Sequence, residues 1–343
     1  MCYTIKSMRK RLLIVLITFC LLSAGYSSFL EEGVKYFQNN RWDEAISAFK
    51  DYLKTNPTDS QVYTYLGICY FKKGNLSFAK SNLEKALSID SKNGLAELYL
   101  GRFYYVEGNF NSALAQYEKA ITHLETSKKL AYQDCGNIYY QLAHKELNPL
   151  NRQRYLNLSL DNYQKAIRED ASDANLYVDI GDVFWELADK ESALKYYRKA
   201  KDLDPSLPAL YNSLGFVYQQ SSSLQLAEEN YIKAIKLYEE KLKDPLLSFD
   251  EKKGYEAELL SCYFGAGVVA IGRGDLEKAL YCFTKANKLV PNDPQVYIGL
   301  ATVYEKKGDK VKAKELLVEA LNFAQKQNNT ILIKALEDKL KRI

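Results

Sequence analysis

Residues that could carry out catalysis are few and widely spaced in this 343-residue sequence. It holds two histidines, His123 and His144, and neither has cysteine, histidine or carboxylate neighbours at the spacing of a zinc site. A glycine-rich phosphate-binding loop follows a β-strand, and no segment of this sequence has a convincing strand pattern. Gly265-Ala266-Gly267 is therefore not expected to bind phosphate. The carboxylates are numerous, but they stand beside lysines on faces that should be solvated. We therefore expect a chain that is not an enzyme, with no metal site and no cofactor.

The elements that would position any functional residue follow from a repeat. A small residue is followed three positions later by an aromatic one and twelve positions later by Ala. This pattern occurs at Gly67, Tyr70 and Ala79, at Gly101, Tyr104 and Ala113, at Gly181, Phe184 and Ala193, and at Gly215, Tyr218 and Ala227. The step from Gly67 to Gly101 is 34 residues, a period that predicts stacked helix–turn–helix units. Gly and Ala at these positions allow the two helices of a unit to approach closely.

The period breaks at two places. In one unit, the small residue of the first helix, Gly136, and the matching large residue of the second helix, Tyr163, are 27 residues apart, whereas the same two positions are 16 residues apart in other units. In addition, the seventh unit starts 52 residues after the sixth. We expect these insertions, near residues 141–158 and 240–259, to be helical. In the first, Asn148-Pro149 separates two helices that each extend about two turns beyond normal. In the second, Pro245 ends a helix, and a capping box of Ser248 and Glu251 starts a long helix that reaches Arg273.

The first 25 residues have a different character. Lys6, Arg9, Lys10 and Arg11 precede an apolar run at residues 12–22, and small residues follow it. This is the layout of a secretory signal peptide, with cleavage expected before Tyr26. The alternative is an uncleaved membrane anchor, although eleven apolar residues are short for a hydrocarbon core about 30 Å thick.

Removal of this segment changes both the charge and the cysteine count. Its four basic residues account for the net charge of +4, so the remaining chain is balanced, which argues against nucleic acid as a partner. Four cysteines remain: Cys69, Cys135, Cys262 and Cys282. They fall in non-adjacent units or at unmatched places along their helices, whereas a disulfide requires Cα atoms within about 7 Å. We expect four free thiols, mostly buried.

The repeat resembles the tetratricopeptide repeat. Leu66-Gly67 with Tyr70, Ala79, Leu83 and Ala86 carries the likeness, and Tyr replaces the family's Trp at the fourth position in most units. The resemblance implies an all-α fold, a right-handed superhelix or α-solenoid of about eight helix-turn-helix repeats over residues 26–327. Residues 328–343 would then form a C-terminal capping helix.

In this family the first helix of each unit lines a concave groove, chiefly through its second, fifth, ninth, twelfth and thirteenth positions. The twelfth positions of the first five units are aromatic: Phe37, Phe71, Tyr105, Tyr140 and Trp185. Polar residues at related positions include Arg102, Asn137 and Asp182. These eight residues would form a groove for a partner peptide or protein, with aromatic side chains as anchors. The alternative is that the twelfth residue packs against the next unit.

The resemblance therefore implies a non-catalytic protein–protein interaction scaffold or adaptor. With the export segment, we expect it in the periplasm or cell envelope of a bacterium, with membrane contact only through an uncleaved N-terminal segment. Two alternatives stay open. One is a membrane-tethered assembly factor, and the other is a peptidoglycan- or sugar-binding repeat protein whose groove aromatics stack on sugars.

Overall fold

The computed structural model describes residues 29–126 and 128–343, and within these residues all regular secondary structure is helical. The expected export segment, residues 1–25, lies outside the described residues. Among the described helices, none is both long enough and apolar enough to span a bilayer. The chain divides into two compact units.

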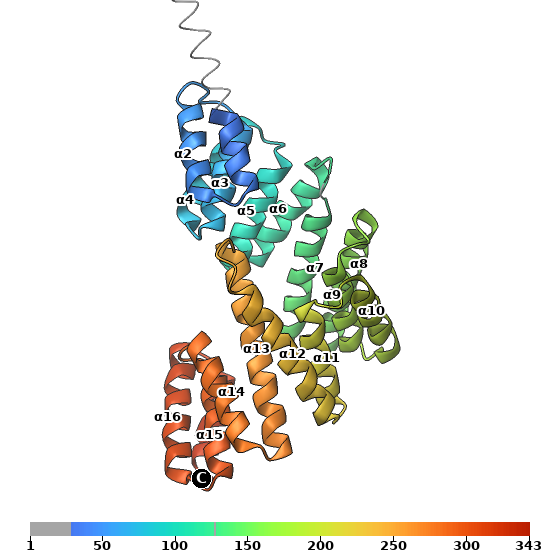
Figure 1. Cartoon of the computed structure of the whole chain (residues 1–343), viewed down its shortest axis with the longest axis vertical. Helices are drawn as coiled ribbons and strands as arrows, with labels where there is room; N and C mark the ends of the chain where they lie inside the picture. Colours follow the sequence, from blue (N-terminus) through green and yellow to red (C-terminus); the bar gives the residue numbers. More distant parts are fainter. Residues whose placement is uncertain (1–28, 127) are drawn as a thin grey trace, which may run out of the picture. The chain divides into compact units, whose positions relative to one another are not determined.

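Unit 1 comprises residues 29–169 together with 248–250. After the helical residues 29–38 it contains α2 (Trp42–Leu53), α3 (Ser60–Lys72), α4 (Leu76–Ile89), α5 (Gly94–Val106), α6 (Phe110–His123), α7 (Lys128–Lys145) and α8 (Pro149–Glu169). From α2 to α8, each helix packs against the next one in the chain (Figure 1). In addition, α3 contacts α5 and α5 contacts α7, so the first helices of neighbouring repeats share one face.

Unit 2 comprises residues 170–247 and 251–343. Its helices are α9 (Ala174–Glu186), α10 (Lys190–Leu203), α11 (Pro208–Gln220), α12 (Leu224–Lys241), most of α13 (Phe249–Arg273), α14 (Leu276–Leu289), α15 (Pro294–Lys306), α16 (Lys310–Lys326) and α17 (Thr330–Leu340). In unit 2, α9 and α11, which are the first helices of two neighbouring repeats, are in contact. The prediction of an all-α solenoid built from helix pairs is confirmed.

Turn chemistry explains where the helices of a repeat begin and end. Gly74 and Gly108 adopt φ values of +76° and +74°, a conformation that costs glycine little. The next residues then cap the second helix. Asn75 Oδ1 accepts a hydrogen bond from the Phe78 N–H, and Asn109 Oδ1 accepts one from the Ser112 N–H. The sequence Gly-Asn therefore stops one helix and starts the other.

The core of each repeat forms where a small residue faces a large one across the helix pair. A Cβ atom added to Gly101 would lie 2.5 Å from Tyr117 Cε1, and one added to Gly181 would lie 2.5 Å from Tyr197 Cε1. Ala193, in the second helix of its repeat, is fully buried. These contacts leave no room for a larger side chain, which is why the period retains Gly and Ala.

The helices lengthen where the period breaks. α7 has 18 residues and α8 has 21, whereas α5 has 13 and α6 has 14. Pro149 is the first residue of α8, where its missing N–H is tolerated. Similarly, α12 has 18 residues and ends before Pro245, and α13 has 25 residues and ends at Arg273. The extra residues therefore extend helices and do not form long loops.

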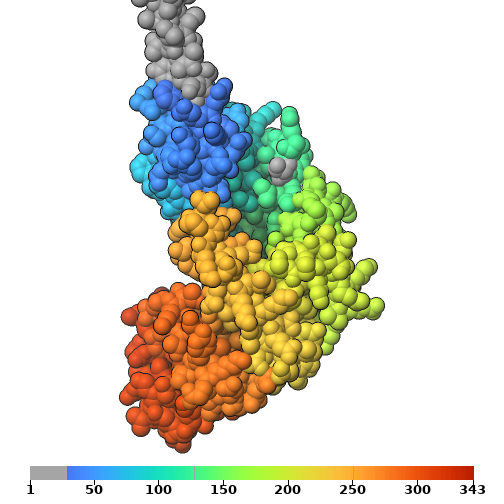
Figure 2. All heavy atoms as spheres, viewed as in Figure 1, coloured from blue at the N-terminus to red at the C-terminus, as the bar shows by residue number. Residues whose placement is uncertain are grey.

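The last helix covers the end of the repeat stack. α17 packs against α16, and Leu336 is its buried apolar residue. Three of its four charged side chains, Lys334, Glu337 and Asp338, are exposed, as expected of a terminal helix with one apolar face. Figure 2 shows side chains filling the space between neighbouring helices on the face that it presents.

Candidate functional site

The inner face of each unit is formed by the first helices of neighbouring repeats. In unit 1 these are α3, α5 and α7, and in unit 2 they include α9 and α11. Four of the five aromatic residues expected to line a groove belong to unit 1, whereas Trp185 belongs to unit 2.

Phe71 does not contribute a surface for a ligand. Its side chain is only 3% exposed, and it belongs to a buried cluster with Leu83 and Leu100. Its ring meets the Tyr99 ring of the next repeat edge-on, with centroids 6.0 Å apart. At this position the twelfth residue packs against the next unit, because apolar residues of α4 and α5 surround it. The prediction that Phe71 lines the groove is therefore wrong.

Phe37 is part-exposed and packs on two neighbouring rings. Its centroid lies 5.0 Å from that of Tyr65 and 5.7 Å from that of Trp42. These contacts fix the ring orientation by packing within the first repeats. Phe37 therefore offers an edge to solvent and has no hydrogen-bonding group.

Tyr105 and Tyr140 combine part-exposed rings with polar hydroxyl groups. The Tyr105 ring stacks on Phe110 with centroids 5.8 Å apart, and its hydroxyl accepts a hydrogen bond from Gln141 Nε2. Burial raises the pKa of Tyr105 above its usual value. The Tyr140 ring meets the His144 ring edge-on, with the ring centroids 4.6 Å apart. Both rings are held by neighbours of α6 or α7, so they form a pre-ordered amphipathic surface.

Trp185 lies near the end of α9 in unit 2 and is part-exposed. The Lys190 ammonium group lies 5.4 Å from its ring centroid, within the range of a cation–π contact. This contact joins the two helices of one repeat across their turn. The indole keeps an exposed portion beside a positive charge.

Arg102 makes an ion pair between two repeats of unit 1. Its Nε donates to Asp134 Oδ2 at 2.7 Å, and the two side chains are 20% and 17% exposed. The guanidinium also lies 5.2 Å from the Tyr99 ring centroid. The bond connects α5 to α7 and holds the guanidinium in one orientation.

Asn137 and Asp182 each accept a hydrogen bond from a buried tyrosine of the second helix. The hydroxyl of Tyr163, from α8, donates to Asn137 Oδ1 at 2.7 Å. In unit 2 the hydroxyl of Tyr197, from α10, donates to Asp182 Oδ1 at 2.6 Å. Both tyrosines are nearly fully buried. Each hydroxyl therefore reaches from the second helix through the core to a polar residue of the first helix.

Asp182 has an environment that disfavours its charge. Burial raises its pKa to about 7, and the charges of Glu258 and Glu186 act in the same direction. The hydrogen bonds from Tyr197 and from Ser213 Oγ, the latter 3.1 Å long, oppose this shift. Since Ser213 lies on α11, the carboxyl group links α9, α10 and α11.

A signal for these buried hydroxyl groups is present in the sequence. The twenty-fourth position of the repeat is Tyr in four consecutive units, at Tyr117, Tyr163, Tyr197 and Tyr231. Tyr231 likewise donates to Gln219 Oε1, at 2.9 Å. In the two preceding repeats the same position holds Phe49 and Leu83. Buried tyrosines generally need a hydrogen-bond partner, so this run of Tyr could have indicated the polar stretch.

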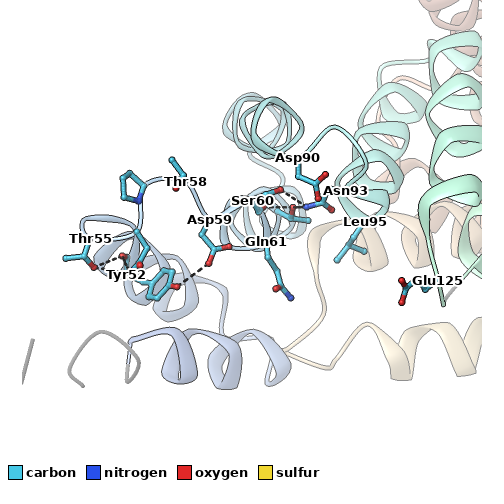
Figure 3. A pocket seen from close by; sticks show the side chains of 13 residues that line it. Tyr52, Thr55, Thr58, Asp59, Ser60, Gln61, Asp90, Asn93, Leu95 and Glu125 are labelled. Atoms are coloured by element: carbon cyan, nitrogen blue, oxygen red, sulfur yellow. Dashed lines mark hydrogen bonds between the residues drawn. The ribbon is translucent and has the colours of Figure 1, made fainter. Parts of the chain in front are cut away.

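A polar cleft of about 950 Å³ lies at the edge of unit 1, where the turns between repeats meet (Figure 3). The Tyr52 hydroxyl donates to Asp59, and Asn93 Nδ2 donates to Ser60 Oγ at 2.8 Å and to Thr64 Oγ1 at 2.9 Å. Asp59 and Asn93 also cap α3 and α5. Asp59 and Asn93 thus stabilise the turns that join the repeats.

Family models decide the class of the chain. Models described as tetratricopeptide repeat match residues 30–79, 174–207 and 270–339. The chain is a tetratricopeptide repeat protein.

Curated relatives of this tetratricopeptide repeat chain are similar to parts of it. Superkiller protein 3 of Schizosaccharomyces pombe is 25% identical over 175 residues, which is 51% of the chain and 12% of that relative. Photosystem I assembly protein Ycf3 of Rippkaea orientalis is 31% identical over 84 residues, 24% of the chain and 49% of the relative. The chain thus spans at most about half the length of these relatives.

Solved structures share the fold over more of the chain. A chain of the APC/C Cut9-Hcn1 hetero-tetramer gives a TM-score of 0.67 at 18% identity, covering 91% of this chain and 55% of that one. A tetratricopeptide repeat protein from Parabacteroides merdae gives 0.56 at 14% identity, covering 81% and 98%. At these identities the likeness concerns the fold alone.

The remaining candidates for chemistry in this tetratricopeptide repeat protein are its cysteines and His123. Cys69, Cys135, Cys262 and Cys282 are free and buried, as predicted. Burial raises the pKa of the Cys69 thiol to about 12. His123 Nδ1 lies 2.8 Å from the buried carboxylate of Glu97. The described residues contain no cluster of His, Cys, Asp and Glu suited to a metal ion.

Proposed function

We propose that this protein is a non-catalytic scaffold that holds a segment of another protein on the inner face of its repeats. The observation that carries the proposal is the pair Tyr105 and Tyr140 on neighbouring first helices of unit 1. Both rings are part-exposed, and both are held in place by neighbouring side chains. Rigid aromatic side chains that already occupy their bound orientation lose little entropy on binding.

Two further observations support a scaffold. Tetratricopeptide repeats stack into extended surfaces of the kind that proteins use to bind other proteins. A curated relative, photosystem I assembly protein Ycf3, carries an assembly role in its name. We propose an assembly or adaptor role for this chain by that analogy, with a partner of its own.

We also propose that the protein acts outside the cytoplasm, in a bacterial cell envelope. The support is the basic start, the apolar run at residues 12–22 and the small residues that follow it. N-terminal sequencing of the protein recovered from its native cells tests this proposal. A chain that starts at Tyr26 supports a released, exported scaffold, whereas a retained N-terminus supports the membrane-tethered alternative.

Binding at the inner face can be tested with peptides selected by the full chain from a random phage-displayed library. Replacing both Tyr105 and Tyr140 with Ala should weaken binding of a selected peptide by about 30-fold or more, as for aromatic anchors in other interfaces. Tyr281→Ala is the matched control, because Tyr281 is 56% exposed on a second helix, α14.

Two results would count against the scaffold. The first is a library that yields no enriched peptide. The second is a selected peptide whose affinity falls equally in the double variant and in Tyr281→Ala. Far-ultraviolet circular dichroism of each variant shows whether the repeats have kept their helical content.

A further inference from the structure

The turn between α7 and α8 presents two leucines that no described part of the chain covers. Leu147 is 87% exposed and Leu150 is 76% exposed, the two highest values for large apolar side chains among the described residues. All residues from 147 to 151 are exposed. Because large apolar side chains gain free energy when they leave water, two of them at one turn favour contact with a surface that removes them from water.

The extra residues of α7 carry this turn outward. Gly101 and Gly136 occupy the same place in successive repeats, on α5 and α7. α5 ends at Val106, five residues after Gly101, whereas α7 ends at Lys145, nine residues after Gly136. At about 1.5 Å of rise per residue, the four additional residues lengthen α7 at this end by about 6 Å. The insertion in this repeat therefore produces a protrusion.

Hydrogen bonds fix the shape of the turn. Asn148 Oδ1 accepts from the N–H of Leu150 at 2.9 Å and from the N–H of Asn151 at 3.3 Å. Glu146 Oε1 accepts from the Asn148 N–H at 2.9 Å. Pro149 then begins α8 with a fixed φ. The exposure of the leucines thus follows from the geometry of a capped helix start.

Basic side chains stand beside the two leucines. Lys145 is the last residue of α7 and is exposed. Arg154 is also exposed and lies four residues after Leu150, which places both on one side of α8. Residues 135–160 contain one acidic residue, Glu146, and three basic ones, Lys145, Arg152 and Arg154. Positive charge is therefore in excess around the apolar turn.

A lipid surface fits this combination better than a protein partner does. A stable protein interface buries roughly 1,000 Å² or more in total, and a single protruding turn with two leucines offers much less. A bilayer accepts protruding apolar side chains between its headgroups, and anionic headgroups attract neighbouring Lys and Arg side chains. Both requirements are met within residues 145–154, which we call the α7–α8 tip.

We propose that the α7–α8 tip inserts Leu147 and Leu150 into the headgroup region of a membrane that contains anionic phospholipid. The N–H groups of Lys145, Arg152 and Arg154 donate to lipid phosphates. This contact is additional to the N-terminal segment, to which the sequence alone would confine membrane contact. It goes beyond the proposed scaffold function and does not depend on peptide binding at the inner face.

Quenching of tryptophan fluorescence by brominated lipid tests the insertion. The full chain carrying Leu150→Trp is mixed with vesicles of brominated phosphatidylcholine, with and without phosphatidylglycerol. A side chain within the lipid is quenched, so this variant should lose more fluorescence than the parent on the vesicles that contain phosphatidylglycerol. Trp42 and Trp185 give the parent and the variant the same background.

Ile331→Trp is the matched control. Ile331 is 74% exposed and is the second residue of α17, just as Leu150 is the second residue of α8. Both residues follow an asparagine whose side chain caps the helix. The control variant should show no more quenching than the parent, because acidic residues accompany Lys334 on α17. Residues 1–25, where attached, act equally in all variants.

Further changes in the Leu150→Trp chain separate the apolar contribution from the charged one. Leu147→Ser should raise the lipid concentration that gives half-maximal quenching by about tenfold or more. Arg154→Gln should raise it by about fivefold, as expected for one basic residue at an anionic surface. Lys334→Gln, which removes an exposed charge from α17, should leave it unchanged.

Three results would overturn the proposal. The first is a Leu150→Trp variant that anionic vesicles do not quench, and the second is equal quenching of Ile331→Trp. The third is a second copy of the chain as the true occupant. In that case Leu150→Trp stays unquenched, and a Leu147→Ser, Leu150→Ser chain elutes later than the parent in size-exclusion chromatography. Peptide selection by the inner face is read out separately, so either proposal can fail while the other stands.

Discussion

Asp182 makes a specific prediction about how stability depends on pH. Its carboxyl group has a pKa of about 7 in the fold, against an ordinary value of 3.8, chiefly because it is buried. The folded state therefore holds a proton that the unfolded chain releases near pH 4. The stability supplied by this group is complete below pH 3.8 and is lost as the pH rises to about 7.

The magnitude follows from the two pKa values. A difference of about three pKa units, at 1.36 kcal/mol each, gives an upper limit of about 4 kcal/mol at pH 8. Asp182 keeps some contact with solvent, so water stabilises part of the charge in the fold. We expect about 1–3 kcal/mol.

Asp182→Asn removes the ionisation and keeps the hydrogen bonds. An amide oxygen can accept from Tyr197, and the amide nitrogen can donate to Ser213 Oγ. The variant should therefore be more stable than the parent at pH 8 by this amount, and the gain should shrink as the pH is lowered toward 4. Urea unfolding followed by circular dichroism at several pH values measures the difference.

Asp202→Asn serves as the control, because Asp202 is an exposed carboxylate on the neighbouring helix α10. It should follow the parent at every pH. An Asp182→Asn variant whose stability runs parallel to that of the parent from pH 4 to pH 8 would refute the reasoning. So would a variant that is less stable than the parent at pH 8.

Three more predictions concern the core. Phe71→Ala should destabilise unit 1 by about 3–5 kcal/mol, because Phe71 is buried. A shift in the midpoint of urea unfolding measures this change, and an unchanged midpoint would indicate that Phe71 lies on the groove surface. Ala193→Leu should lower stability by about 1–3 kcal/mol through overpacking, since Ala193 is fully buried; an unchanged melting curve would contradict the assigned repeat register. Cys69, Cys135, Cys262 and Cys282 should react with a thiol reagent only after unfolding, because burial raises their pKa values; rapid labelling of the native protein, located by mass spectrometry, would show that they are accessible.

The sequence was most informative where one local rule determines a position. Gly74 and Asn75 predict both the end of α3 and the start of α4, because a positive φ and a capping amide each demand a particular residue type. The lengthening of α7 and α8 followed in the same way from the late return of the pattern and from Pro149. Local chemistry alone accounts for these features.

The candidate site was harder to predict because exposure depends on neighbours from other repeats. Phe71 and Tyr105 share a place in the repeat, yet Phe71 is enclosed by Leu83 and Leu100, whereas Tyr105 remains part-exposed beside Gln141. A periodic pattern gives every unit the same expectation and cannot separate these cases. The bond from Tyr163 to Asn137 connects different helices for the same reason, and it appears only when the helices are placed together.

The buried tyrosines also bear on how the inner face could be redesigned. Exchanging Asn137 or Asp182 alone for a residue with no hydrogen-bond acceptor would remove the acceptor of the Tyr163 or Tyr197 hydroxyl, a destabilising change of about 1–3 kcal/mol. A new specificity therefore has to be introduced as a pair of changes, one on the surface and one beneath it.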